Sequence, residues 1–357
     1  MRVRRFSAET KTPSISPAAR PSPSRYRGSL PLPQCGRGAL DAFVSRRILT
    51  LRDRISGGLI GLLVGDALGV PYEFHPAPAI PPGELIEFDP PPGFRRAHVG
   101  VQPGTWSDDG AQALCLLASL LQCDRFDAAD FGRRLINWYD YGYLAVDHHV
   151  FDIGVQTAAA LARLSAGTPP LEAGGTEERG KGNGSLMRVL PLALWHRGTD
   201  EALVRDAHHQ SCLTHGHITV QACCALYCLW ARRMLEAATD PWASALAALR
   251  AIYRGHPAHL EALEGEIRPE AERTPRGSGF VLDCLFSAKA ALEAGPYEAV
   301  VKAAVALGND TDTTACVAGG VAGIRDGLEA IPTRWRDRLR GQADLQPLHD
   351  ALLARLG

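Results

Sequence analysis

The sequence predicts a single all-α domain over residues 48–357. Apolar residues recur three and four positions apart through most of this stretch, which is the spacing of a buried helix face, and strand signals are absent. Hydrophobic residues make up 46% of the chain but aromatic residues only 7%, so the core must consist mostly of Ala, Leu and Val. That mixture suits packed helices, and a chain of 357 residues is long enough for one sizeable core.

The first 47 residues differ in composition from everything after them. They are rich in Arg, Ser and Pro, contain few acidic residues and show no apolar periodicity. Such a segment cannot bury enough apolar surface to offset the entropy lost on ordering, so it is predicted to be a disordered tail. An Arg- and Ser-rich start also fits a transit peptide, although it lacks an apolar signal core.

A glycine repeat opens the helical region. Four glycines recur every four residues and form a ridge along one face of a helix, where a second backbone can approach closely. They are Gly57, Gly61, Gly65 and Gly69. No apolar run reaches the roughly 20 residues of a membrane span, because the best one, residues 55–64, is soon interrupted by Asp66.

Proline and helix-capping residues divide the rest of the chain. A Pro-rich stretch over residues 75–104 cannot continue a helix and is predicted to be a long surface loop. The helix after it begins near Ser107 or Asp108, either of which can serve as N-cap. Further helices are predicted over residues 127–139, 155–166, 217–238, 243–253, 280–294, 297–307 and 313–325, and a closing helix over residues 335–356. The Gly-rich stretch 174–184 is interpreted as an inserted loop.

Charge and cysteine usage restrict the partners and the compartment. Lys and Arg (38) nearly balance Asp and Glu (39), so no global basic field attracts nucleic acid or an anionic membrane. The nine cysteines lack a CxxC pair, and most lie in Ala- and Leu-rich runs. They are predicted to be reduced, buried thiols of a cytoplasmic protein.

Two acidic turns carry the candidate chemistry, and each immediately precedes a predicted helix. They read Trp106-Ser107-Asp108-Asp109-Gly110 and Gly308-Asn309-Asp310-Thr311-Asp312-Thr313-Thr314. Helix capping accounts for one or two such residues per turn. If the turns meet in space, four carboxylates would repel one another unless cations lie between them. Capping and metal binding both remain open from the spacing alone.

The ligand chemistry narrows the choice of cation. Hard oxygen ligands without a nearby His or Cys select Mg²⁺, Mn²⁺ or Ca²⁺ over Zn²⁺. An EF-hand loop is excluded, because counting from Asp310 the sixth position is Ala315 instead of Gly and the twelfth is Val321 instead of Glu.

Six motifs in a fixed order carry a family resemblance. They are Gly65-Asp66-Ala67-Leu68-Gly69 with Pro71-Tyr72-Glu73-Phe74, Ser107-Asp108-Asp109, Phe151-Asp152-Ile153-Gly154, Gly182-Asn183-Gly184-Ser185-Leu186-Met187-Arg188, Thr214-His215, and Gly308-Asn309-Asp310-Thr311-Asp312-Thr313. Together they resemble the motif series of the ADP-ribosylglycohydrolase family and span about residues 55 to 325. Each motif alone is weak, but the series is specific.

The resemblance implies an orthogonally packed helical domain that holds two Mg²⁺ or Mn²⁺ ions and cleaves the glycosidic bond between ADP-ribose and an acceptor. The implied metal ligands are Ser107, Asp108, Asp109, Asp310, Asp312 and Thr313. Glu73 or Asp109 would act as the general acid or base while positive charge develops at the anomeric carbon, by analogy with glycoside hydrolysis. The acceptor would be a protein side chain or a small molecule.

The resemblance also implies a set of substrate-binding residues. Asp152 matches the residue that faces the distal ribose, and backbone N–H groups of the Gly-rich loop can approach the diphosphate. The implied set is Asp152, Gly154, Asn183, Gly184, Ser185, Met187 and His215, with Glu178 as a further acidic contact.

Two positions depart from the family pattern. Ser107 stands where the pattern usually has Thr, and its hydroxyl can still be offered to a metal. Gly110 stands where the pattern usually has Thr or Ser, which removes a hydroxyl and is expected to loosen the start of the helix. All four predicted metal-binding aspartates are present, so the sequence favours an active enzyme. Two alternatives remain: a noncatalytic ADP-ribose-binding relative, and a dimetal phosphatase acting on a nucleotide.

Overall fold

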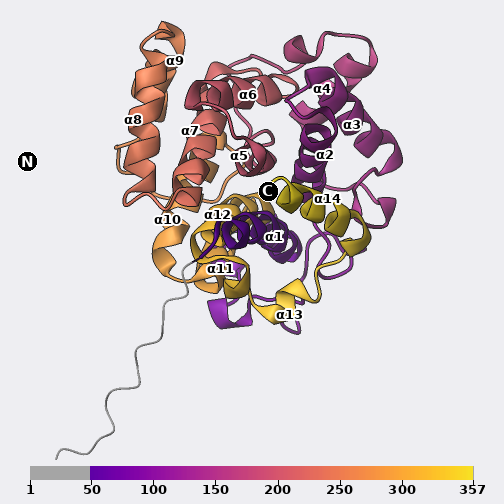
Figure 1. Ribbon diagram of the computed structural model, residues 1–357. Coiled ribbons are helices and arrows are strands. Elements are labelled where there is room, and N and C mark those ends of the chain that lie inside the picture. The colour runs from indigo at the N-terminus through magenta and orange to yellow at the C-terminus, as the bar shows by residue number, and fades with distance from the viewer. Residues whose placement is uncertain (1–48, 357) are drawn as a thin grey trace, which may run out of the picture. The chain divides into compact units, whose positions relative to one another are not determined.

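The computed structural model describes residues 49–356, and these form an all-α fold (Figure 1). The described residues contain fourteen α-helices, several short 3-10 turns and one π-helical turn, with isolated β-bridges and no strand. The predicted fold class is confirmed. The predicted tail, residues 1–47, lies outside the described residues.

Most of the predicted helices are present, with ends that differ by a few residues. The helices are α1 Leu51–Gly69, α2 Asp108–Cys123, α3 Ala128–Tyr141, α4 Val155–Ser165, α5 Leu190–Trp195, α6 Asp200–Cys212, α7 Ile218–Leu235, α8 Pro241–Tyr253, α9 Pro257–Glu261, α10 Val281–Ala291, α11 Tyr297–Ala306, α12 Thr311–Asp326, α13 Thr333–Arg336 and α14 Gln342–Ala354. Helices α5, α6 and α9 were not predicted. The prediction of a single closing helix is wrong, because Gly341 has a φ of 71° and separates α13 from α14.

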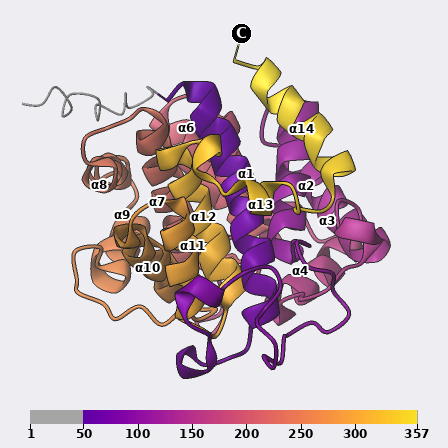
Figure 2. The same cartoon turned by 90° about the horizontal axis from the view of Figure 1, so that it is seen from below.

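Helices α1 and α12 form the centre of the fold and lie side by side (Figures 1 and 2). A Cβ on Gly57 would lie 2.1 Å from the carbonyl oxygen of Gly323, and a Cβ on Gly61 would lie 2.5 Å from that of Gly319. Because Gly57 faces Gly323 and Gly61 faces Gly319, the two helices run antiparallel. The predicted close approach along the glycine ridge is confirmed, and only glycine fits at these contacts.

Helix α1 with the following 3-10 turn, Leu51–Tyr72, is long and apolar enough in composition to cross a membrane. Its apolar stretch is completely buried in the protein, however, and core helices pass the same test. The burial identifies α1 as a core helix.

The Pro-rich stretch after α1 is only partly a surface loop. It contains two short 3-10 turns, Ala77–Ala79 and Gly83–Leu85. Between them and α2, the side chains of Ile86 and Phe88 are fully buried, and the ring of Phe88 packs near Trp335 with a centroid separation of 6.4 Å. These apolar anchors hold the loop against the core.

Eight of the nine cysteines fall in the described part of the chain, and all eight are free thiols. Six of them are buried, and Cys123 and Cys212 are partly buried. Cys35 lies outside the described residues.

Candidate active site

Helix α1 brings the two acidic turns to one end of the fold. The buried carboxylate of Asp66 accepts hydrogen bonds from the backbone N–H of Ser107 (2.9 Å) and of Gly110 (2.8 Å), in the first turn. Burial raises the pKa of Asp66 to about 7, despite these two bonds. In the second turn, the hydroxyl of Thr311 donates to the carbonyl oxygen of Gly69 (2.8 Å). Both turns are therefore attached to the last turns of the same helix.

The turns meet directly at a cavity of about 440 Å³. The hydroxyl of Thr313 donates to Oδ1 of Asp109 over 3.4 Å, across the junction. Eleven of the fifteen predicted site residues line the cavity: Glu73, Asp108, Asp109, Asp152, Gly154, Asn183, Gly184, Met187, His215, Asp310 and Thr313. The sequence motifs thus converge in space, although they are separated by up to about 240 residues in the chain.

The carboxylates at this junction are largely shielded from solvent. Asp108, Asp109 and Asp312 are buried, and burial together with the neighbouring carboxylates raises the pKa of each well above its usual value. Within the described residues, Oδ2 of Asp109 and both carboxylate oxygens of Asp312 have no hydrogen-bond partner. Buried, unpartnered oxygens of this kind are costly unless a cation accompanies them.

The donor set fits hard divalent cations. One carboxylate oxygen each from Glu73, Asp310 and Asp312 lies within 4.8 Å of the other two, which is close enough for one ion to contact all three. Oxygen donors alone favour Mg²⁺ or Mn²⁺. The residues present therefore fit the cations that the acidic turns led us to expect.

Ser107 acts as the N-cap of α2. Its Oγ accepts a hydrogen bond from the backbone N–H of Asp109 (3.3 Å), and it does not line the cavity. Gly110 follows in the first helical turn, where a Cβ would lie 2.8 Å from side-chain atoms of Leu63 and Trp106. There is no room for a larger residue at this position. The expected loosening of the helix start is counteracted, because the N–H of Gly110 donates a hydrogen bond to the Asp66 carboxylate.

The Gly-rich loop before α5 lines the cavity with Gly182, Asn183 and Gly184. The side-chain amide of Asn183 donates to Oδ2 of Asp310 (2.8 Å), so this loop contacts the second acidic turn. Gly184 lies against the ring of His215, where a Cβ would be 2.8 Å from Cε1. Burial, with the nearby Arg188, lowers the pKa of His215 to about 3, so this imidazole is neutral near pH 7.

Two predicted substrate-binding residues do not reach the cavity. Ser185 is fully buried, and its hydroxyl bonds with that of Ser211 (2.8 Å) inside the core. The carboxylate of Glu178 is exposed and pairs with Lys181 and with Nε2 of His217 (3.4 Å). Ser185 matched a motif of which Gly182, Asn183, Gly184 and Met187 line the cavity, but its own hydroxyl contacts Ser211 in the core.

The sequence profile described as ADP-ribosylglycohydrolase matches residues 48–357, most of the chain. The chain belongs to the ADP-ribosylglycohydrolase family. The resemblance predicted from the six motifs is confirmed.

The chain is similar to named relatives and to a solved structure. It is 30% identical to ADP-ribosylarginine hydrolase Tri1 of Pseudomonas putida, over 85% of this chain and 78% of the relative. It is 26% identical to the ADP-ribosyl-[dinitrogen reductase] glycohydrolase of Rhodospirillum rubrum, over 86% of this chain and 98% of that one. A solved structure, described as an ADP-ribosylglycohydrolase-related protein complex, superposes with a TM-score of 0.68 at 33% identity, over 85% of this chain and 98% of the other.

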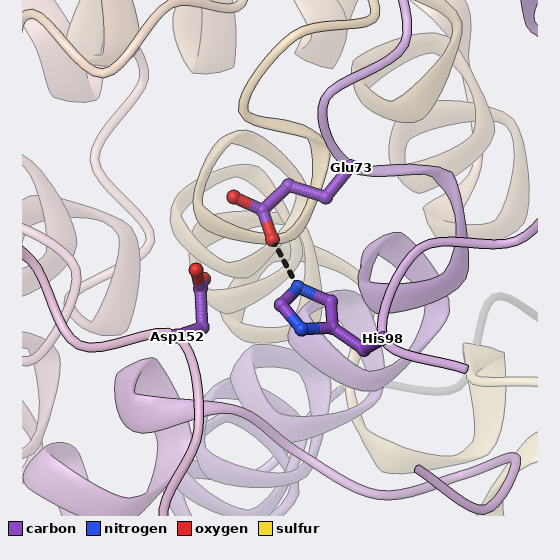
Figure 3. A group of neighbouring side chains, drawn as sticks. All are labelled: Glu73, His98 and Asp152. Carbon is purple, nitrogen blue, oxygen red and sulfur yellow. Dashed lines mark hydrogen bonds and ion pairs between the residues drawn. The ribbon is translucent and has the colours of Figure 1, made fainter. Parts of the chain in front are cut away.

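The structure also shows site residues to which the sequence analysis assigned no role. Phe74, Gln156 and Thr157 line the cavity, and Nε2 of His98 lies 2.6 Å from the Glu73 carboxylate (Figure 3). Phe74 and Thr157 could have been suspected from their neighbouring motifs. His98 carries no such signal, because it lies in the Pro-rich stretch, 25 residues from Glu73.

Arg188 belongs to a predicted motif but had no predicted role. Its buried guanidinium donates to the side-chain oxygen of Gln112 (2.9 Å) and to the hydroxyl of Thr214 (2.7 Å). Gln112 in turn donates to Oδ2 of Asp108 (2.9 Å), and Thr214 bonds to Nδ1 of His215. Arg188 thus connects Gln112, which supports Asp108 of the first acidic turn, to Thr214, which supports His215.

Proposed function

We propose that this ADP-ribosylglycohydrolase hydrolyses the glycosidic bond between ADP-ribose and an acceptor, and that two Mg²⁺ or Mn²⁺ ions support the reaction. The observation that carries the proposal is the convergence of both acidic turns, Glu73 and the Gly-rich loop on one cavity. Relatives named as hydrolases of ADP-ribosylarginine and of ADP-ribosyl-dinitrogen reductase support the same class of substrate.

The aspartates of the two turns would hold the cations. Asp109 and Asp312 carry the buried oxygens without partners. Asp108, Asp109, Asp310 and Thr313 line the cavity, whereas Asp312 does not line it but has a carboxylate oxygen within 4.8 Å of those of Glu73 and Asp310. When bound, such ions neutralise the carboxylates, orient hydroxyl groups of the ribose and lower the pKa of a bound water. A ligand role for Ser107 stays a prediction, since its hydroxyl is engaged as the helix cap.

Glu73 is the better candidate for proton transfer. Burial and the charges of Asp152 and Asp310 raise its pKa to about 11, so its carboxyl group holds a proton firmly when no cation is nearby. It lines the cavity, where it can exchange a proton with water or with the leaving group. Asp109 is less suited to this task, because its free oxygen is completely buried.

The turn before α4 and the Gly-rich loop would bind the ADP-ribose part of the substrate. Asp152 and Gly154 line the cavity on the turn before α4, and Asn183, Gly184 and Met187 line it on the Gly-rich loop. Because His215 is neutral, backbone N–H groups of the loop and the cations would have to offset the diphosphate charge. We also propose a cytoplasmic location, which the free thiols support.

The proposal is tested with ADP-ribosyl-arginine, ADP-ribosyl-serine and O-acetyl-ADP-ribose, each with Mg²⁺, with Mn²⁺ and with a chelator. We expect release of free ADP-ribose from at least one substrate, only when a divalent cation is present. Asp310→Ala should lower kcat on the order of 100-fold or more, which is typical for a lost electrostatic group at a reaction centre.

Asp140→Ala is the matched control, because Asp140 is exposed on α3, outside the cavity lining. This variant should retain full activity. Release of phosphate in place of ADP-ribose would favour the phosphatase alternative. Binding of ADP-ribose without turnover of any substrate would favour the noncatalytic alternative.

A further inference from the structure

The backbone around Glu73 is attached to the second acidic turn. The N–H of Phe74 donates to the carbonyl oxygen of Asn309 (2.7 Å), and the N–H of Asn309 donates to the carbonyl oxygen of His75 (2.6 Å). This two-way exchange sets the distance between the Glu73 segment and Asp310. It does not set the direction of the Glu73 side chain, which extends from the segment into the cavity.

His98 supplies the contact that the side chain of Glu73 makes in the structure. Nε2 of His98 lies 2.6 Å from Oε2 of Glu73, and Figure 3 shows the edge of the imidazole pointing at the carboxylate, with Asp152 nearby. Both side chains are shielded from solvent, since 13% of the His98 side chain and 6% of the Glu73 side chain is exposed. A hydrogen bond in such surroundings is not easily replaced by water.

Two phenyl rings hold the imidazole in place. The ring centroid of His98 lies 5.5 Å from that of Phe74 and 5.0 Å from that of Phe151. Phe74 directly follows Glu73 in the chain, and Phe151 directly precedes Asp152. The ring of His98 is therefore packed between the segments that carry two of the cavity carboxylates.

The backbone at this point is held in unfavourable conformations. Phe74 (φ 63°), His98 (φ 49°) and Asp152 (φ 56°) all lie in the left-handed region, which residues with a Cβ rarely adopt. Such residues persist only where the surrounding structure holds them, and they gather at functional sites. Here three of them lie around one hydrogen bond.

Glu73 lies between two groups of potential partners. Its carboxylate is within 4.8 Å of ligand atoms of His98 and Asp152 on one side, and of Asp310 and Asp312 on the other. The direction of the Glu73 side chain therefore decides whether it contacts His98 and Asp152 or Asp310 and Asp312. His98 is not part of the cavity lining, and its hydrogen bond to Glu73 is the contact that links it to the proposed proton transfer.

We propose that His98 is a positioning residue, which directs the Glu73 carboxylate to the place from which it exchanges a proton in the reaction. This inference rests on the proposed function for the role of Glu73. The hydrogen bond between Nε2 of His98 and the Glu73 carboxyl group and the packing of the imidazole ring between Phe74 and Phe151 together provide the positioning.

The test uses three variants of the full chain with the cation bound. His98→Phe keeps an aromatic ring but loses the hydrogen bond, and we expect kcat to fall about 10- to 100-fold, as for other supports of catalytic groups, with KM little changed. His98→Gln can donate a hydrogen bond from its amide and should recover part of the loss. His149→Ala is the control, because His149 is an exposed histidine that stacks near Phe151 without contacting Glu73.

A double-mutant cycle separates action through Glu73 from general damage. In the Glu73→Gln background, His98→Phe should cause little further loss of kcat. An equal loss in both backgrounds would overturn the proposal, as would a His98→Phe enzyme with wild-type kcat. Melting temperatures of all variants show whether they fold.

Crystal structures of the wild type and of His98→Phe provide a readout that does not depend on activity. We expect the Glu73 carboxylate to leave its place beside Asp152 in the variant. If Glu73 keeps its wild-type position, the proposal is wrong, whether or not the protein is a hydrolase. A wild type that cleaves none of the substrates would instead count against the proposed function, while the displacement of Glu73 would still decide the positioning role.

Discussion

At the scale of single residues, Asp312 shows why the acidic site needs a bound cation. Its side chain is fully buried, and neither carboxylate oxygen finds a hydrogen-bond donor among residues 49–356. Burial and the charges of Glu73, Asp152, Asp109 and Asp310 raise its pKa well above the usual value. Such a group destabilises the fold when ionised and alone, and stabilises it when a cation is bound.

Asp312→Asn should therefore have opposite effects on stability and on activity. Without cations the variant should melt at a higher temperature than the wild type, because one buried charge is removed, with a gain on the order of 1 kcal/mol. It should also lose most of its stabilisation by Mn²⁺ and have kcat lowered at least about 100-fold. Thermal melts with chelator and with Mn²⁺ measure both effects. A variant that is less stable than the wild type under both conditions would contradict this account of the site.

At the scale of elements, the contact between α1 and α12 determines where the acidic turns lie. Gly57 and Gly61 face Gly323 and Gly319 so closely that the helix backbones touch. Helix α1 binds the first acidic turn through Asp66, and α12 begins within the second. The glycine ridge thus stabilises the core and sets the spacing of the site.

Gly61→Ala should be strongly destabilising, because its Cβ would lie 2.5 Å from the carbonyl oxygen of Gly319. We expect a loss of about 2–3 kcal/mol and reduced activity, since the helices must move apart. Gly132→Ala on α3 is the matched control: its Cβ would lie 3.8 Å from the nearest side chains, an ordinary contact. That variant should be up to about 1 kcal/mol more stable than the wild type, because Ala favours a helix interior. Chemical unfolding of both proteins distinguishes the two outcomes, and equal effects would show that the ridge is not the cause.

A second element contact joins α6 to α8 and α9 through His208. Its Nε2 lies 2.7 Å from the hydroxyl of Tyr253, and its ring stacks on that of His259 with centroids 4.5 Å apart. Burial, together with the nearby His259, His209 and His256, lowers the pKa of His208 to about 3. The imidazole is therefore neutral in the folded protein well below pH 6.

This depressed pKa predicts a loss of stability in mild acid. In the unfolded chain His208 takes up a proton near pH 6.5, whereas in the folded chain it does so only near pH 3. The contribution of His208 to the free energy of unfolding therefore falls as the pH drops from 6.5 towards 3. The slope per histidine is at most about 1.4 kcal/mol per pH unit. In His208→Gln, the free energy of unfolding measured with urea should fall less between pH 7 and pH 5 than in the wild type. A steeper decline of the free energy of unfolding in His208→Gln would refute the assignment.

At the scale of the whole molecule, one hydrophobic core connects the described part of the chain. It extends from Ile55 on α1 to Leu353 on α14 without a break into separate clusters. The chain divides by its contacts into residues 1–47 and residues 48–357, and the family profile covers the second unit. The unit that carries the core therefore also carries every candidate site residue.

A protein of residues 48–357 should accordingly fold by itself and retain activity. We expect its thermal unfolding to be one cooperative transition at the temperature of the full chain, because the core is contained in it. Its kcat should match that of the full chain on the same substrate. Loss of activity in the shorter protein with an unchanged melting temperature would assign a role in the reaction to residues 1–47.

Local signals in the sequence account for the features that were predicted correctly. The glycine ridge and the apolar spacing of α2, α7 and α12 depend on neighbours three or four residues away, so they can be read without the fold. Helix α6 was missed because its sequence is mostly polar, and α5 because it has only six residues. The closing helix was predicted too long, because the left-handed turn at Gly341 was not recognised.

By itself the sequence determined the fold class, the family and the two acidic turns, because periodicity and motif chemistry lie in adjacent residues. Only the tertiary structure decided which side chains meet. Packing of distant segments directed Ser185 into the core and Glu178 to the surface, and brought His98 to Glu73. Such contacts depend on how α1 and α12 pack and on how the Pro-rich stretch folds back over their ends, and no local pattern encodes that arrangement.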